Sequence, residues 1–203
     1  MNSLELFNQI YKNQLTPSFE KSLLTFFSDV VLSRINHDHF INILDLGCGS
    51  KSIFEEIKLE RTNITAIDFS SYAINMARQH SQSKEIIKYE VMDLEQDLLP
   101  VNSFDLVFDS HCLHCIEGLG SREMVWNNLY QSLKQGGILA AEMMVQAIGN
   151  DVRFPHKHIP NARDLELEII NKGFKIIYFT IERSRQFANG QESCDLVRVL
   201  AQK

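Results

Sequence analysis

Between Phe40 and Met143 the chain alternates between short apolar runs and amphipathic stretches with helical spacing. The apolar runs predict strands at Phe40–Leu46, Ile64–Ile67, Ile86–Met92, Phe104–Asp109 and Ile138–Met143. The amphipathic stretches predict helices at Lys51–Leu59, Tyr72–His80 and Met124–Leu133. Strands that alternate with helices favour a mostly parallel sheet covered on both faces, so we expect an α/β fold in three layers.

The remainder of the chain predicts one further helix and two further strands. Asn161 is a typical N-cap for a helix that runs to Lys172, and Gly173 follows it as a C-terminal cap. Strands are expected at Phe174–Ile181 and Asp195–Ala201 with no helix between them. They should pair as a hairpin, which completes a seven-stranded sheet with an antiparallel C-terminal strand.

Two helices are expected before the first strand. Leu4, Phe7 and Tyr11 fall on one helical face, and Thr16-Pro17 is typical of the start of a second helix that runs to about Ile35. With 203 residues, the chain suits a single domain. We expect residues 1–36 to form a helical cap over the site and residues 40–203 to form the core.

Charge and composition narrow the classes of partner. The formal net charge is −6, with no basic cluster of the kind that nucleic-acid binders carry, so nucleic acid is disfavoured. No apolar run is long enough to span a membrane, and the first residues do not resemble a secretory signal. The four cysteines are expected to be free thiols in the cytoplasm, in a monomer or homodimer.

The segment Ile43–Ser50 reads as a buried strand that enters a glycine turn, Gly47-Cys48-Gly49. Glycines allow close approach of the backbone to a ligand, and a following helix would offer free N–H groups. Asp45 precedes the first glycine, where a pyrophosphate-binding turn does not normally have a carboxylate. A ligand with an ammonium group can use one.

Two more acids follow the next strands in order. Asp68, followed by Phe69, ends the second strand, where a carboxylate can accept hydrogen bonds from ribose hydroxyls. Asp93, followed by Leu94, ends the third strand and could accept a bond from an adenine amino group. Since ligands of open α/β sheets bind at the carboxyl ends of the strands, the three acids predict one site.

In order and spacing, these blocks resemble the class I S-adenosylmethionine-dependent methyltransferases of Rossmann-like fold. The resemblance extends through Phe104–Asp109 and Leu133–Ile138 and covers roughly residues 40–200. It implies S-adenosylmethionine as cofactor and methyl transfer to O, N or S of a small-molecule acceptor. The implied cofactor-binding residues are Tyr11, Asp45, Gly47, Cys48, Gly49, Asp68, Phe69, Asp93, Leu94 and Asp109.

The resemblance also assigns roles. Gly47 and Gly49 would face the methionine and ribose parts, Asp45 the ammonium group and Asp68 the ribose hydroxyls. Tyr11 matches an aromatic residue that relatives place as a lid. The family usually has a third glycine at the position of Lys51, so this residue departs from the pattern. Its side chain is a candidate to bind the cofactor's carboxylate.

The segment Asp109–Ile116 should border the transferable methyl group. It contains two histidines, and histidine can accept a proton near neutral pH, so His114 and then His111 are the candidate bases. The Cys112–Cys115 pair and these histidines also suggest zinc, but no second ligand pair follows by spacing, and we expect no metal.

His156 and His158, after the fifth strand, are candidates for contact with the acceptor. Three alternatives stay open at this point. The chain could methylate a protein side chain, or it could be a non-catalytic, cofactor-binding regulatory module. A nicotinamide dehydrogenase is disfavoured because the third glycine is missing and Asp45 is out of place.

Overall fold

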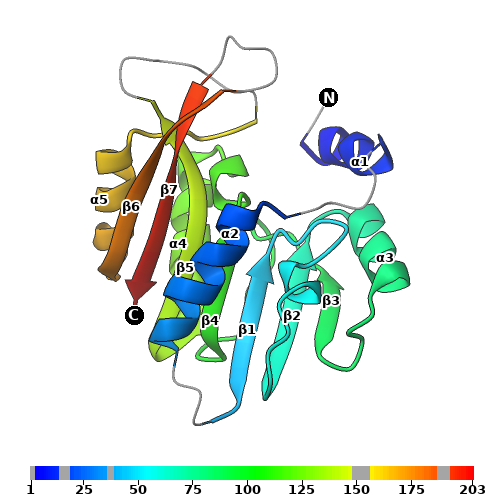
Figure 1. The fold of residues 1–203 in the computed structure, drawn as a ribbon. Coiled ribbons are helices and arrows are strands. Elements are labelled where there is room, and N and C mark those ends of the chain that lie inside the picture. Colours follow the sequence, from blue (N-terminus) through cyan, green and yellow to red (C-terminus); the bar gives the residue numbers. More distant parts are fainter. Residues whose placement is uncertain (1–2, 14–18, 36–38, 148–155, 187–192) are drawn as a thin grey trace.

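The computed structural model describes residues 3–13, 19–35, 39–147, 156–186 and 193–203 (Figure 1). Its centre is a seven-stranded sheet in the order β3-β2-β1-β4-β5-β7-β6. The strands are β1 (Ile41–Leu46), β2 (Thr62–Asp68), β3 (Ile87–Val91), β4 (Phe104–Ser110), β5 (Leu133–Gln146), β6 (Lys175–Gln186) and β7 (Ser193–Gln202).

The sheet is parallel from β3 to β5, and β7 runs antiparallel to both of its neighbours, β5 and β6. The predicted fold class, a mostly parallel seven-stranded sheet with an antiparallel C-terminal strand, is confirmed. The strand order changes direction at β1 and β4, and the chain crosses from one half of the sheet to the other there. Such a switch point is where open α/β sheets form their ligand crevice.

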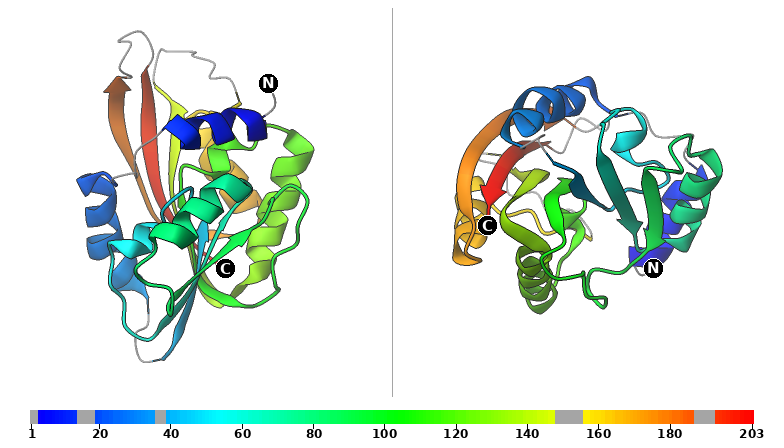
Figure 2. Two further views of the ribbon diagram at one scale, coloured as in Figure 1. Left: turned by 90° about the vertical axis from the view of Figure 1, so that its right-hand side faces the viewer. Right: turned by 90° about the horizontal axis from the view of Figure 1, so that it is seen from below.

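Alternating side chains of each strand enter two separate cores. On one face, β1 residues such as Ile43 pack with a helical segment that comprises α2 (Lys21–Thr25), a π-helical turn (Phe26–Val31) and a 3-10 turn (Leu32–Arg34). The helix α3 (Ser71–His80) packs on the same face. Figure 2 shows the sheet between this helical layer and the one opposite.

The opposite face is covered by α4 (Leu119–Ser132) and α5 (Ala162–Asn171). Trp126 and Leu129 of α4 meet Leu44 and Val107 of the central strands in this core. The predicted caps of α5 are confirmed, since the Asn161 side chain accepts a bond from the Asp164 N–H and Gly173 has a φ of +92°. The three predicted layers are thus present.

The predicted helix over Lys51–Leu59 is wrong, and only a single 3-10 turn, Ile53–Glu55, forms there. Ser52 is extended, and its side chain caps that turn by accepting a bond from the Phe54 N–H. The Glu55 carboxylate accepts a bond at 2.9 Å from Tyr89 of β3, which holds the segment against the sheet. Tertiary contacts therefore override the helical spacing of the sequence.

Only part of the predicted N-terminal cap lies over the site. The helix α1 (Ser3–Asn13) lies at the carboxyl ends of β1 to β3 (Figure 1), whereas the second helical segment packs on the face of the sheet. The predicted Thr16-Pro17 start lies outside the described residues, and the described helix begins after Glu20. Among the described residues, no helix is long and apolar enough to span a membrane.

Candidate functional site

A cavity of about 110 Å³ opens at the carboxyl ends of β1 to β4, beneath α1. Its lining comes from α1, the ends of β1, β2 and β3, and the segment after β4. The lining residues are Phe7, Tyr11, Gly47, Ile67, Asp68, Phe69, Met92, Asp93, Leu94, Glu95, His111, Cys112, Cys115 and Ile116. This concave surface is located at the switch point of the sheet, and six of the residues predicted to bind the cofactor line it.

Both glycines of the turn are needed for the main-chain conformation and for close packing against neighbouring residues. Gly47 and Gly49 have φ values of +59° and +60°, a region that side-chain-bearing residues rarely adopt. A Cβ atom on Gly47 would lie 2.6 Å from the Cβ atom of Cys112, and one on Gly49 would lie 3.2 Å from the Tyr11 ring. The turn thus lets the segment after β4 and the lid helix α1 approach β1 closely.

Asp68 is the centre of the hydrogen bonds at this edge. Its Oδ2 atom accepts bonds from the Gly49 N–H at 3.0 Å and from the Tyr11 hydroxyl at 3.2 Å, and its Oδ1 atom accepts from the Ser70 N–H at 2.8 Å. Burial raises the pKa of Asp68, although these bonds oppose the rise. Burial and the nearby Asp68 charge also raise the pKa of Tyr11, so Tyr11 stays a hydrogen-bond donor. The Tyr11 hydroxyl thus occupies one acceptor site of Asp68, the carboxylate predicted to hold the ribose hydroxyls.

Two further carboxylates, Asp45 and Asp109, are buried behind the cavity. Burial raises the pKa of each to about 7. The Ser52 hydroxyl donates to Asp45 Oδ2 at 2.6 Å. Oδ1 of Asp109 accepts the N–H groups of Cys112 and Leu113, while its Oδ2 atom has no hydrogen-bond partner in the described part of the chain. An orphaned buried oxygen in an acidic surrounding favours a cationic ligand.

The apolar end of the cavity is aromatic. Phe7 of α1 packs edge to face with Phe69, with 5.7 Å between ring centroids. Asp93 and Leu94 line the same end, and the Asp93 carboxylate accepts bonds from the Glu95 N–H and the Gln96 side chain. The placement of Phe69, Asp93 and Leu94 is consistent with a planar, apolar ring system such as adenine.

Four residues predicted for the cofactor do not line the cavity: Asp45, Cys48, Gly49 and Asp109. Cys48 packs against the core on the α3 face of the sheet, and Asp45 and Asp109 are fully buried. Lys51, the candidate for the cofactor's carboxylate, instead pairs with Glu56 at 2.8 Å and lies 5.8 Å from the centre of the Phe19 ring. The Lys51 side chain thus forms an ion pair within its own loop and is not directed to the cavity.

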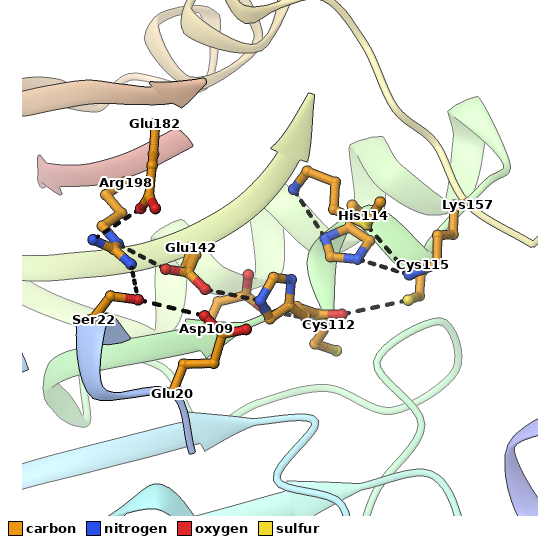
Figure 3. A network of polar contacts seen from close by, with 12 residues as sticks. Glu20, Ser22, Asp109, Cys112, His114, Cys115, Glu142, Lys157, Glu182 and Arg198 are labelled. Atoms are coloured by element: carbon orange, nitrogen blue, oxygen red, sulfur yellow. Dashed lines mark hydrogen bonds and ion pairs between the residues drawn. The ribbon is translucent and has the colours of Figure 1, made fainter. Parts of the chain in front are cut away.

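His111 lies on the lining and is held by an acid that the sequence did not reveal. Its Nε2 atom is 2.8 Å from Oε1 of Glu142 on β5, and its main chain has a φ of +70°. Oε2 of Glu142 accepts a bond at 2.7 Å from Nε of Arg198 on β7 (Figure 3). The buried Glu142 and the half-buried Arg198 face each other in the β5–β7 register, so their pairing can be recognised only when the strand pairing is known.

His114 has the opposite environment, because its side chain is buried and does not line the cavity. Nδ1 accepts a bond from the Met144 N–H at 3.3 Å, and Nε2 lies 3.2 Å from the Lys157 ammonium nitrogen (Figure 3). Burial and the nearby Lys157 charge hold the pKa of His114 well below its usual range. Of these two candidate bases, His111 is the one that lines the cavity and has an acidic partner, whereas His114 has neither feature.

His156 and His158 do not line the cavity either. Nδ1 of His156 lies 3.6 Å from a carboxylate oxygen of Glu117, and the His158 N–H donates to the His114 carbonyl at 2.7 Å. Burial lowers the pKa of His158. Within the described ranges, no group of three His, Cys, Asp or Glu side chains is arranged to hold a metal ion.

Residues 44–141 match the family described as "Methyltransferase domain". An uncharacterized methyltransferase of Schizosaccharomyces pombe is 30% identical over 113 residues, which cover 55% of this chain and 43% of that protein. A ubiquinone biosynthesis O-methyltransferase of Coxiella burnetii is 25% identical over 99 residues, which cover 48% of this chain and 41% of that protein. Each match spans less than half the length of these relatives.

Solved structures share the fold at low sequence identity. A methyltransferase of Methanosarcina mazei, described as SAM-dependent, has a TM-score of 0.72 and 19% identity, covering 86% of this chain and 97% of its own. The N-methyltransferase NodS of Bradyrhizobium japonicum, solved with S-adenosyl-l-homocysteine, has a TM-score of 0.66 and 17% identity, covering 96% and 98%. The [4+2]-cyclase SpnF has a TM-score of 0.71 and 17% identity, covering 94% and 84%.

The sheet order, the glycine turn and the matched family agree with one another. The chain has the fold of the class I, Rossmann-like methyltransferases, and its residues 44–141 match the methyltransferase-domain family. The resemblance predicted from the sequence is thereby confirmed.

Proposed function

We propose that the cavity binds S-adenosylmethionine and that the chain transfers its methyl group to a small molecule. The observation that carries the proposal is the set of three buried carboxylates around the glycine turn, Asp45, Asp68 and Asp109, with the Asp109 Oδ2 atom lacking a partner among the described residues. Buried acids of raised pKa gain from a positive charge nearby. S-adenosylmethionine carries positive charge on both its ammonium group and its sulfonium sulfur.

The cavity residues divide into three tasks for this ligand. Asp68 would accept the ribose hydroxyls, and the apolar end with Phe69 and Leu94 would hold the adenine. Asp109 and Asp45 would balance the positive charge from behind the turn. When bound, S-adenosylmethionine supplies a methyl group that is activated by the positive sulfur.

Binding requires a change at α1. The present cavity of about 110 Å³ is smaller than the roughly 300 Å³ or more that is usual for such ligands. The Tyr11 hydroxyl also uses an acceptor site of Asp68. We infer that Tyr11 withdraws from Asp68 as the cofactor enters, and that α1 then covers it and excludes water.

A small-molecule acceptor suits this geometry better than a protein side chain. The α1 helix lies across the opening, and we place the acceptor beside His111, Cys115 and Ile116 of the lining. The net charge of −6 gives no support for nucleic acid as acceptor. Cys48, Cys112 and Cys115 are free thiols, in keeping with the proposed cytoplasmic location.

Calorimetry with S-adenosylhomocysteine tests the proposal directly, with NAD as the competing ligand. We expect S-adenosylhomocysteine to bind at a single site and NAD to show no heat of binding. Tight NAD binding without a response to S-adenosylhomocysteine would overturn the proposal. Binding without methyl transfer to any acceptor would instead favour the regulatory module.

A further inference from the structure

His111 and Glu142 are brought together by the register of the sheet rather than by sequence proximity. Ser110 of β4 faces Glu142 of β5, so the residue after Ser110 begins the loop directly beside that carboxylate. The main-chain N–H of His111 donates to the Glu142 carbonyl at 3.2 Å, and the side chains meet at 2.8 Å. Both contacts act on one residue, so the ring is held from its main chain and from Nε2.

Arg198 holds the other oxygen of Glu142. Its Nε atom donates to Glu142 Oε2 at 2.7 Å, and its second terminal nitrogen donates to the Ser22 hydroxyl at 3.0 Å. Its other terminal nitrogen lies 3.4 Å from Glu182, and its guanidinium lies 5.6 Å from the Phe26 ring centre. Figure 3 shows Arg198 between the two glutamates. These contacts from three elements fix Arg198, and through it they fix the buried carboxylate.

The hydrogen-bond donors among Arg198, Glu142 and His111 determine which ring nitrogen of His111 carries the proton. A guanidinium can only donate, so Glu142 must accept from Arg198. Glu142 is buried, which alone would raise its pKa, but the hydrogen bonds from His111 and Arg198 and the charge of Arg198 bring the pKa below its ordinary value. An ionised Glu142 has only acceptors, so Nε2 of His111 donates to it. Nδ1 then remains unprotonated, with no hydrogen-bond partner among the described residues.

We propose that Glu142 is the positioning residue of a His111 general base, and that the acceptor is a neutral molecule with a weakly acidic hydroxyl group. The inference rests on the proposed function and names the substrate class of the same site. Arg198 completes the arrangement by holding Glu142. A purely structural Glu142–Arg198 pair would not need a half-exposed histidine at the cavity wall as its third member.

The reaction follows from the free ring nitrogen. The acceptor oxygen passes its proton to Nδ1 of His111 and forms its new bond to the methyl carbon, while the sulfur of S-adenosylmethionine keeps the electron pair of the broken bond. The resulting imidazolium donates from Nε2 to the ionised Glu142, which stabilises it. An acceptor that is already anionic needs no base, and the described lining contains no Lys or Arg to attract one.

The other groups that face His111 do not replace Glu142. The Asp109 carboxylate is occupied on Oδ1 by the main chain of the same loop, and the His114 ring lies 5.3 Å away, centre to centre. The Cys115 thiol donates to the His111 carbonyl at 3.4 Å, and burial raises its pKa to about 11. Burial likewise raises the pKa of Cys112, so both thiols stay neutral.

Glu142→Gln tests the positioning role without requiring an identified acceptor. Arg198 still needs an acceptor, so the Gln carbonyl turns to it and the Gln NH₂ faces His111. In ¹⁵N NMR spectra of the full chain at pH of about 8, we expect the His111 proton on Nε2 in the wild type and on Nδ1 in Glu142→Gln. Glu142→Asp, which retains the charge, and Glu182→Gln, which removes only the outer partner of Arg198, should keep the proton on Nε2. His111→Ala assigns the signal.

A wild-type proton on Nδ1, or an unchanged proton position in Glu142→Gln, would overturn the positioning role. The rate test uses catechol as the neutral hydroxyl probe and benzylamine as the amine probe, with S-adenosylhomocysteine formation as the readout. Glu142→Gln should lower the rate with catechol about 100-fold and leave S-adenosylhomocysteine affinity within about twofold. Glu142→Asp should recover part of the rate.

The double variant separates action through His111 from independent action. Glu142→Gln should cause no further loss of rate in a His111→Ala background, since residues that act as a unit are not additive. An additive loss, or turnover of benzylamine but not catechol, would refute the inference. Failure of the wild type to bind S-adenosylhomocysteine would refute the proposed function instead, and the NMR result would still report on the pairing.

Discussion

The glycine turn after β1 and the segment after β4 touch each other at Gly47 and Cys112, but different interactions determine their conformations. The glycine turn depends on its own main chain, with positive φ at Gly47 and Gly49. The segment after β4 depends on distant strands, because its His111 is positioned by Glu142 of β5 and, through it, by Arg198 of β7.

The difference separates the two halves of the proposed reaction. The turn and the acids around it form the proposed cofactor side. The His111 side is the acceptor side, assembled from contacts across the sheet. A variant that affects one half and spares the other would confirm that they are independent sites, and equal effects on both would show that they are coupled.

The largest effect is expected from Asp68→Ala on the cofactor side. It removes the acceptor of bonds from Gly49, Ser70 and Tyr11 and the predicted partner of the ribose. Loss of a buried, charged hydrogen-bond partner should weaken S-adenosylhomocysteine binding about 100-fold in calorimetry. Asp93→Ala, at the other end of the cavity, is the matched comparison with a smaller expected loss. Unchanged affinity in Asp68→Ala would place the cofactor elsewhere.

The second prediction compares two histidines on the acceptor side. His111→Ala should lower turnover about 100-fold, because it removes the base and leaves the fold intact. His114→Ala should instead lower the melting temperature by about 6 °C, since the buried Met144 N–H and the Lys157 ammonium lose their partner. Turnover and thermal unfolding measured on both variants separate the roles. A greater loss of turnover in His114→Ala would restore the order expected from the sequence.

The third prediction concerns pH on the cofactor side. Asp45 and Asp109 have pKa values of about 7 in the folded chain against a usual 3.8. A raised carboxyl pKa means that ionisation is resisted only in the fold, so stability should fall as pH rises from about 4 to about 7 and then level off. The ammonium group of the ligand favours the ionised acids, so S-adenosylhomocysteine affinity should rise about tenfold between pH of about 6 and about 8.

Asp109→Asn serves as the variant for that titration, because it keeps the Oδ1 acceptor for the Cys112 and Leu113 N–H groups. Its free energy of unfolding should vary less with pH, and its S-adenosylhomocysteine affinity should lose most of the pH dependence. Arg122, His111 and Asp45 are the charged or titratable groups that act on Asp109, so their variants are secondary controls. A pH slope that persists in Asp109→Asn would assign it to another group.

The smallest effect is expected where α1 meets the glycine turn. Tyr11→Phe removes the hydroxyl that occupies Asp68 and keeps the ring against Gly49. If the hydroxyl competes with the ribose, S-adenosylhomocysteine should bind about fivefold tighter, the equivalent of one hydrogen bond of about 1 kcal/mol. Weaker binding would show that Tyr11 holds the ligand after it enters.

The sequence predicted the strands and the seven-stranded sheet, because these follow from apolar periodicity. It also placed Asp68 and Asp93 at strand ends, and both line the cavity. It failed for Lys51–Leu59, where the Ser52 N–H and the Glu55 carboxylate both bond to the hydroxyl of Tyr89, a residue distant in the chain. It also missed Glu142 and Arg198. Both lie within apolar strands and look like single charged interruptions until the β5–β7 register is known.

The place of β7 in the sheet bears on how the chain folds during synthesis. β5 pairs with β4 on one side, but its other edge is completed only by β7, which follows both α5 and β6 in the chain. Until β7 has been made, a long apolar strand with open N–H and C=O groups lies at the edge of a partly formed sheet, an arrangement prone to aggregation. The strand that carries Arg198 therefore also seals that edge, and a slow synthesis of the preceding residues lengthens the time for which it is exposed.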